Sequence, residues 1–411
     1  MLGNKDIQAL SFHRTIFAPL KSTQDSSRSA HSLFLHRAFD RRMALHFLLA
    51  VSHHELAIYQ DRSHDPPQES CLHYRRGTEL LQQQTQAHKT TPNDHLNMML
   101  SFLYMYLFWM RRSRLDPIKI RALSKIVYVY MRDSDLNDLC SLREPPLPLT
   151  HSYPGLAIAT SDQILLARTI IYLYDRDGFC SFFGCGGTLA EFVTGMPEKR
   201  HALWQISRIP FLWPMTDMDL STTSDMPDED RTILDVYFEL IILHQEINRL
   251  SQGFVESPDE AWTKLRQRLD LLKQGASFIT FLVEDKDLRS TKSLMAYVTS
   301  TVFYATCIYL DRATVPGFGG PRSSSTDQAL SSLLKVSYKT VSMGSVQLLE
   351  RFQWALLIAG IETSDEIHRH WVISSISDMG IRDIFRVILD EKFRLGGVIS
   401  MRDIRQLIGK S

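Results

Sequence analysis

Residues 233–250, with the sequence ILDVYFELIILHQEINRL, decide the fold class of this chain. Large apolar side chains recur here at intervals of three and four residues, and charged and amide side chains take the positions between them. On an α-helix this spacing gathers the apolar side chains into one stripe, so it predicts an amphipathic helix that packs against a core. Pro227 and the acidic residues at 228–230 predict its beginning, because proline fits the first turn and negative charge stabilises the positive end of the helix dipole.

Apolar spacing of the same kind predicts helices along most of the chain. They span residues 42–59, 94–111, 118–131, 161–174, 260–284, 293–311, 327–342, 346–359, 364–378 and 384–394. No run of alternating β-branched residues is flanked by hairpin turns, and strands do not alternate with helices. We therefore expect an all-α protein, a large irregular multi-helix domain whose helices pack around one extended apolar core.

The composition is that of a globular protein. The chain has 411 residues, of which 44% are hydrophobic, and its 46 basic residues balance its 46 acidic residues. A chain of this length can bury most of its apolar surface, which excludes disordered, collagen-like and disulfide-stapled classes. The zero net charge gives no overall positive field that would attract nucleic acid or an anionic membrane. The five cysteines are odd in number and widely spread, so we expect reduced thiols.

We expect one domain over residues 1–411, with flexible loops near 143–154, 216–230 and 312–326, where proline, glycine and serine gather. The most apolar segments are shorter than the roughly 20 residues that span a bilayer, so they predict buried helices and no membrane contact. The first 20 residues lack the unbroken apolar region of a signal peptide. These features predict a soluble intracellular protein.

The sequence does not predict a metal site. A structural zinc cluster needs closely spaced thiolates, and Cys180 and Cys185 have no second cysteine pair near them. Residues 53–55 are His-His-Glu, but the HExxH order that places two imidazoles on one helix face is absent. His368 and His370 are two residues apart, so a helix would point them in nearly opposite directions.

Residues 184–187 form a short glycine-rich segment, Gly-Cys-Gly-Gly, ahead of an apolar stretch. A phosphate cradle at a helix N-terminus is conceivable there. The lysine of a P-loop and a preceding strand are both missing, however, so a tight turn that allows close backbone packing is favoured. The interpretation as a tight turn or pocket loop covers Gly184, Cys185, Gly186 and Gly187.

The sequence contains no motif that specifically indicates an enzyme. Asp175 and Asp177 precede Gly178, but the remaining ligands of a calcium loop are absent. There is no GxSxG motif, no acid and base at readable spacing and no cofactor fingerprint. We therefore predict that the protein is not an enzyme, with no catalytic residue and no cofactor.

Residues 354–363, WALLIAGIET, followed by Asp365, Arg369 and Trp371, resemble the fungal-specific transcription factor domain. This domain is the large helical regulatory region of fungal binuclear zinc cluster regulators. Residues 45–53, LHFLLAVSH, are similar to an early helix of that family, so the resemblance covers nearly the whole chain. The residues taken from the motif, with a structural or regulatory role, are Trp354, Gly360, Glu362, Arg369 and Trp371.

The same motif predicts a corner between two helices. We expect Trp354 to lie in a buried helix end and Gly360 to supply a left-handed C-terminal cap. Thr363 and Glu366 have the spacing of a capping box for the next helix, and Trp371 is expected to face inward.

The resemblance implies the control domain of a transcription regulator that works in the nucleus. It leaves open whether the protein also shuttles to the cytoplasm. Its implied partners are proteins of the transcription machinery or a DNA-binding regulator, and an apolar small-molecule effector and a homodimer are also compatible with the family. The six-cysteine zinc cluster of DNA-binding members is absent, so we expect no direct specific DNA binding from this chain, whether it is part of a longer regulator or stands alone. The basic residues between 111 and 125 are expected to form a solvated helix face. The alternative function is a helical protein-interaction scaffold with no direct role in transcription.

Overall fold

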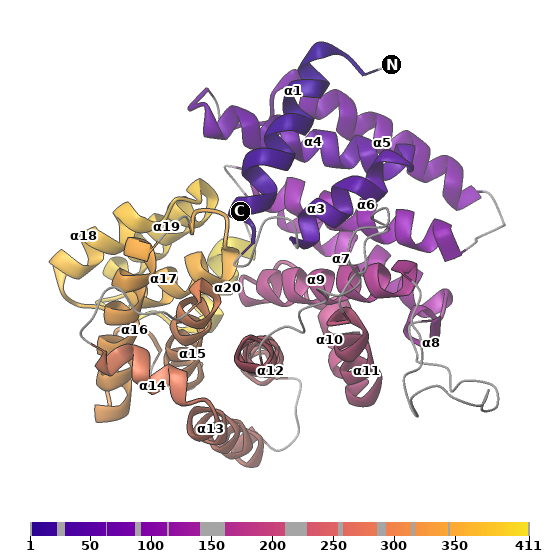
Figure 1. Ribbon diagram of the computed structural model, residues 1–411. Helices are drawn as coiled ribbons and strands as arrows, with labels where there is room; N and C mark the ends of the chain where they lie inside the picture. Colours follow the sequence, from indigo (N-terminus) through magenta and orange to yellow (C-terminus); the bar gives the residue numbers. More distant parts are fainter. Residues whose placement is uncertain are drawn as a thin grey trace, which may run out of the picture.

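The computed structural model describes residues 2–22, 29–62, 64–86, 92–112, 115–139, 161–209, 228–253, 258–285, 293–313, 317–343 and 346–409. Within these ranges the chain is helical and has no β-sheet, so the expected all-α multi-helix fold is confirmed (Figure 1). An antiparallel bridge joins Phe318 to Ile399.

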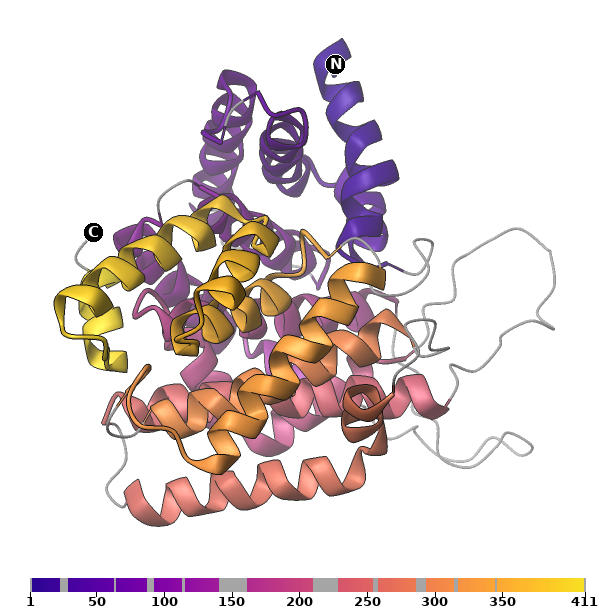
Figure 2. The same ribbon diagram turned by 90° about the vertical axis from the view of Figure 1, so that its left-hand side faces the viewer.

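The N-terminal helices stand together above the rest of the molecule (Figures 1 and 2). Helix α4 lies at their centre and packs against α1, α3, α5 and α6. The bounds of this group are α1 (Asn4–Phe12), a π-helical turn η1 (His13–Phe17), α2 (Ala18–Leu20), α3 (Ala30–Phe39), α4 (Arg42–Tyr59), α5 (Gln68–Gln86) and α6 (Pro92–Met110).

The middle group connects these helices to the rest of the chain. Helix α9 packs against α6 on one side and against α10, α11 and α12 on others. The group comprises α7 (Pro117–Asp133), α8 (Leu136–Leu139), α9 (Ser161–Phe182), α10 (Thr188–Thr194) and α11 (Pro197–Ser207).

Helix α12, which contains the stretch at 233–250, lies between the middle group and the C-terminal helices and is seen end-on in Figure 1. It packs against α9, α10, α13 and α15. The helices from here on are α12 (Asp228–Ser251), α13 (Pro258–Gly275), α14 (Ser277–Glu284), α15 (Leu294–Arg312), α16 (Ser324–Met343), α17 (Glu350–Glu362), α18 (Glu366–Ser375), α19 (Met379–Arg394) and α20 (Met401–Gly409).

Buried apolar side chains form one connected cluster that runs from α1 to α20. Buried ion pairs cross this core and connect distant helices. Arg351 on α17 donates from Nε to Asp175 Oδ1 on α9 at 2.6 Å, and both side chains are buried. Glu350 accepts from Lys21 and lies 3.1 Å from the Arg176 guanidinium. Because removing one partner leaves a buried charge uncompensated, these pairs hold α9 and α17 in one arrangement.

The predicted loops have mixed outcomes. Residues 143–154 and 216–227 lie outside the described ranges, and residues 228–230 are helical rather than part of a loop. The segment Gly317–Ser323 is not helical, yet it is not a loose linker: Phe318 is fully buried, and Arg312 donates to two of the segment's carbonyl groups. The buried side chain of Phe318 and these hydrogen bonds fix the position of this segment, for which the glycine, proline and serine content predicted a flexible loop.

The described cysteines are free thiols. Burial raises the pKa of Cys180 well above its usual value and the pKa values of Cys185 and Cys307 to about 12, so these three remain protonated at neutral pH. Among the described helices, none combines the length and the apolar character that a bilayer span would need.

Candidate functional site

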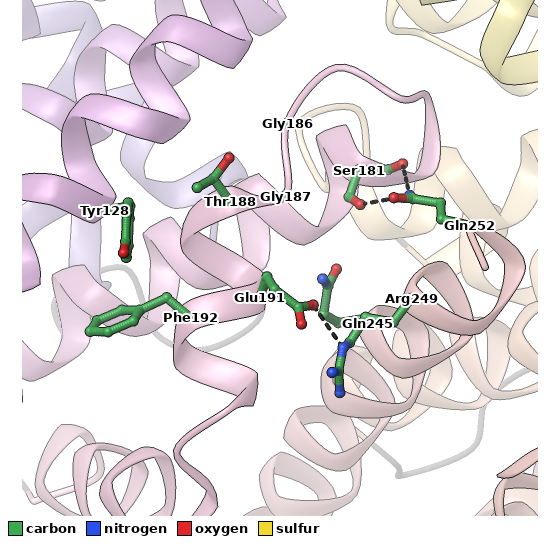
Figure 3. Close-up of a pocket in the computed structure, with 10 residues that line it drawn as sticks. All are labelled: Tyr128, Ser181, Gly186, Gly187, Thr188, Glu191, Phe192, Gln245, Arg249 and Gln252. Carbon is green, nitrogen blue, oxygen red and sulfur yellow. Dashed lines mark hydrogen bonds and ion pairs between the residues drawn. The ribbon is translucent and has the colours of Figure 1, made fainter. Parts of the chain in front are cut away.

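A cavity of about 460 Å³ lies where α7, the turn before α10, and α12 meet (Figure 3). Its volume falls in the range of small-molecule binding sites, about 300–1,000 Å³. Helix α7 contributes one side chain, α9 and the following turn contribute three residues, and α10 and the end of α12 contribute the rest. The lining residues are Tyr128, Ser181, Gly186, Gly187, Thr188, Glu191, Phe192, Gln245, Arg249 and Gln252.

The glycine-rich segment forms the turn at the wall of this cavity. Gly184 and Gly187 have φ angles of +74° and +104°, which glycine adopts without strain. A Cβ atom on Gly187 would also lie 2.7 Å from Ser181 Oγ, and one on Gly186 would lie 2.7 Å from Asp177 Oδ1. Both glycines are therefore needed for the close approach of this turn to α9. Gly186 and Gly187 line the cavity, whereas Gly184 and the buried Cys185 lie in the turn outside its lining.

The carboxylate of Asp177 takes the place where a phosphate cradle would bind its anion. Its Oδ1 accepts from the Gly187 amide at 3.0 Å and its Oδ2 from the Ala190 amide at 2.8 Å. Tyr106 donates its hydroxyl to Oδ1 at 2.8 Å, and Ser124 Oγ accepts from the first two amides of α10. Because the protein's own side chains accept from the amides of residues 187–190, these four donors are not available to a bound phosphate.

Polar groups gather at one end of the cavity. Glu191 on α10 and Arg249 on α12 form an ion pair of 2.7 Å, and their side chains are 45% and 32% exposed. Gln252 donates to Ser181 Oγ at 3.3 Å, and the buried Gln245 also lies in the wall (Figure 3). A partly exposed ion pair contributes little net free energy. Glu191 and Arg249 can therefore separate and pair with a ligand at a small free-energy cost.

Two aromatic rings form the other end. Tyr128 on α7 and Phe192 on α10 meet edge to face, with ring centroids 5.1 Å apart (Figure 3). The Arg132 guanidinium lies 5.2 Å from the centroid of the Tyr128 ring. An aromatic end opposite an end with amides, a hydroxyl and an ion pair fits an amphipathic molecule with a flat apolar part and a hydrogen-bonding head.

The motif residues at 354–371 lie elsewhere, and the predicted role of Gly360 is wrong. Gly360 is inside α17, with helical backbone, and α17 continues to Glu362. A Cβ atom at Gly360 would lie 2.9 Å from both Phe385 Cε2 and Val372 Cγ1. The glycine allows α18 and α19 to approach α17, and it does not supply a left-handed cap.

The next helix is also capped differently from the prediction. Asp365 is the N-cap of α18, and its Oδ1 accepts from the amide of Ile367 at 2.8 Å and from that of His368 at 3.1 Å. Thr363 and Glu366 therefore do not form a capping box. Trp371 is only half-buried and contacts the ring of Tyr338, whereas the neighbouring valine faces the core.

The remaining motif residues make internal contacts. Trp354 is fully buried among the rings of Phe182, His244 and Tyr309. Glu362 accepts from Arg312 Nη2 at 2.6 Å. Arg369 donates to Thr363 O at 3.2 Å. A second cavity of about 480 Å³ involves Glu362 and Arg369; its lining is Gly319, Gly320, Pro321, Arg322, Glu362, Ser364, Arg369, Lys392 and Gly397.

The basic residues between 111 and 125 are not simply a solvated face. The side chain of Arg111 is only 8% exposed, and it donates to Glu55 at 2.6 Å and to Asp378. These two carboxylates outweigh the burial of Arg111 and raise the pKa of its guanidinium. Arg121 donates to the carbonyl oxygen of Gly184 at 3.2 Å. Several of these charges thus hold helices together within the chain.

Sequence reasoning singled out Gly186 and Gly187 but missed the helical residues of the cavity. Glu191, Arg249 and Gln252 are ordinary polar residues of helix surfaces when read one helix at a time. The polar positions at 245 and 249 on α12 and at 252, directly after its end, are spaced by four and three, and this spacing is the signal in the sequence that they share one face. No family model matches the chain, and neither the curated proteins nor the solved structures include one that is significantly similar to it.

Proposed function

We propose that this chain is the effector-binding regulatory domain of a fungal transcription regulator-like protein, and that the cavity between α7, α10 and α12 holds the effector. The observation that carries the proposal is the composition of the cavity wall. Tyr128 and Phe192 offer an aromatic surface, and Ser181, Gln245 and the pair Glu191–Arg249 offer hydrogen bonds and charge. Such a wall is suited to hold an amphipathic small molecule in one orientation.

The position of the cavity supports a regulatory role. Its wall joins α12, which lies between the middle helices and the C-terminal helices, to α7 and α10. A ligand that contacts all three helices would favour one of their relative arrangements over others. The transcriptional part of the proposal rests on the resemblance of residues 354–371 and 45–53, and it includes a nuclear location and action through protein partners.

The lining favours an amphipathic effector over the purely apolar one that the resemblance implies. It also favours binding over catalysis, because the charged groups of the wall, Glu191 and Arg249, are paired with each other. A helical interaction scaffold remains the alternative, and it is favoured by the exposure of Ile367 on α18 (80%) and Phe393 on α19 (88%).

A reporter assay tests the transcriptional proposal. The chain is fused to an unrelated DNA-binding domain in fungal cells, and transcription from a promoter with the matching operator is measured. We expect the fusion to change reporter output. Thr188→Trp, which adds a large ring to the lining of the cavity, should remove the response of the reporter to growth conditions. Thr263→Trp, on the exposed face of α13, is the matched control and should behave as the unchanged chain. A fusion that leaves the reporter unchanged under all conditions would favour the scaffold.

A further inference from the structure

Three N-terminal helices bring two imidazoles and a carboxylate to one point. Asp6 comes from α1, His53 from α4 and His73 from α5. The Nε2 atoms of His53 and His73 each lie 3.0 Å from Asp6 Oδ1, and the three atoms lie within 4.8 Å of one another. The two imidazole rings are nearly parallel, with centroids 5.5 Å apart, and each directs its Nε2 atom at the carboxylate.

We propose that Asp6, His53 and His73 form a binding site for a divalent transition metal ion, with Zn²⁺ as the best match. Zn²⁺ binds imidazole nitrogen and carboxylate oxygen at about 2.0–2.2 Å, which puts tetrahedral ligand atoms about 3.3 Å apart. The observed separations from Asp6 Oδ1 are within a few tenths of an ångström of that spacing. The bound ion would connect α1 to α4 and α5.

The surroundings of the three ligands suit a metal site. His46 Nδ1 lies 2.9 Å from His73 Nδ1, so the two rings share a hydrogen bond that orients His73 with its Nε2 towards Asp6. The Gly3 amide donates to Asp6 Oδ2 at 2.9 Å and leaves Oδ1 directed at the imidazoles.

The proposed site needs a fourth ligand beyond these three residues. Glu69 precedes His73 by one turn of α5, so both side chains lie on the same helix face. Its carboxylate pairs with Lys5 on α1. Rotation of the Glu69 side chain away from Lys5, or a water molecule, would complete a tetrahedral site.

The ligands escape a search by sequence spacing because each comes from a different helix. Residues 6, 53 and 73 share no short motif, and only the packing of α1 and α5 on α4 brings them together. The site is separate from the cavity at α12, so its test does not depend on the proposed function.

Calorimetric titration of the full, tag-free chain with ZnCl₂ tests the proposal. We expect one Zn²⁺ per chain, and a Co²⁺ complex with the visible absorption of a tetrahedral ion. His73→Gln and Asp6→Asn should each weaken Zn²⁺ binding at least about 10-fold, and His46→Phe about 10- to 100-fold through the lost orientation of His73. His201→Ala, which removes an exposed imidazole on α11, is the matched control and should leave the affinity unchanged.

Circular dichroism checks that each variant is folded before titration. Absence of Zn²⁺ binding by the unchanged chain would overturn the proposal and leave Asp6 as a hydrogen-bond acceptor for two imidazoles. Binding that survives in both His73→Gln and Asp6→Asn with equal affinity would overturn it as well, since the ion would then lie at other histidines.

Discussion

Glycine at position 360 has a hydrogen atom in place of a side chain, and this allows α17, α18 and α19 to pack closely. Alanine is about 1 kcal/mol more favourable than glycine in a helix interior. Replacing glycine with alanine therefore stabilises a helix where the added methyl group meets no other atom. Here the added methyl group would meet Phe385 and Val372, and overpacking of this kind costs about 1–3 kcal/mol. We expect Gly360→Ala to lower the free energy of unfolding measured by urea denaturation.

Gly275 provides the control for this residue. It is exposed at the end of α13. Apart from its chain neighbours and the backbone of its own helix, no atom lies within 4 Å of the position of an added Cβ. Gly275→Ala should leave the free energy of unfolding unchanged or raise it by up to about 1 kcal/mol. A Gly360→Ala protein as stable as Gly275→Ala would mean that α18 and α19 move aside without cost.

At the scale of the helices, one carboxylate connects α9 to the turn before α10. Replacing Asp177 with alanine would leave the amides of Gly187 and Ala190 and the hydroxyl of Tyr106 without this acceptor. Each unpaired buried donor costs about 1–3 kcal/mol, so we expect Asp177→Ala to lose at least about 3 kcal/mol of unfolding free energy.

Chemical denaturation of Asp177→Ala beside Asp390→Ala measures this effect. Asp390 is exposed on α19, and its replacement should change stability by no more than about 0.5 kcal/mol. Equal midpoints for the two variants would show that the turn amides find other acceptors.

The helices also show how far sequence reasoning reaches. The predicted helix at 42–59 has the bounds of α4, because its apolar stripe dominates its local energetics. The predicted helix at 161–174 continues as α9 to Phe182. The aspartates that predicted its end have partners distant in sequence: Arg351 pairs with Asp175, and the Ala190 amide on α10 donates to Asp177. The predicted helix at 260–284 breaks at Ala276, where the apolar spacing gives no signal. The cavity needs three helices at once, so no local pattern could specify it.

For the whole molecule, buried histidines couple stability to pH. Burial lowers the pKa of His13 to about 3 and the pKa values of His31 and His244 well below the usual 6.5. Below pH 6.5 the unfolded chain therefore binds protons that the folded chain excludes, and the free energy of unfolding falls as the pH decreases. Each excluded proton contributes about 1.4 kcal/mol per pH unit.

Urea denaturation between pH 7 and pH 4.5 measures this coupling. As the pH decreases, we expect the free energy of unfolding of His13→Gln to fall less steeply than that of the unchanged chain. Below pH 6 the two slopes should differ by the contribution of about one proton. Parallel curves for the two proteins would contradict a neutral, buried His13 in the folded state.

Native mass spectrometry of the chain purified from fungal cells tests whether the cavity between α7, α10 and α12 binds a small molecule. We expect one bound molecule per chain in the unchanged protein and in Thr263→Trp. Thr188→Trp should lose it, with all three proteins folded. A bound molecule that Thr188→Trp retains to the same extent, or its absence from all three proteins, would contradict the claim.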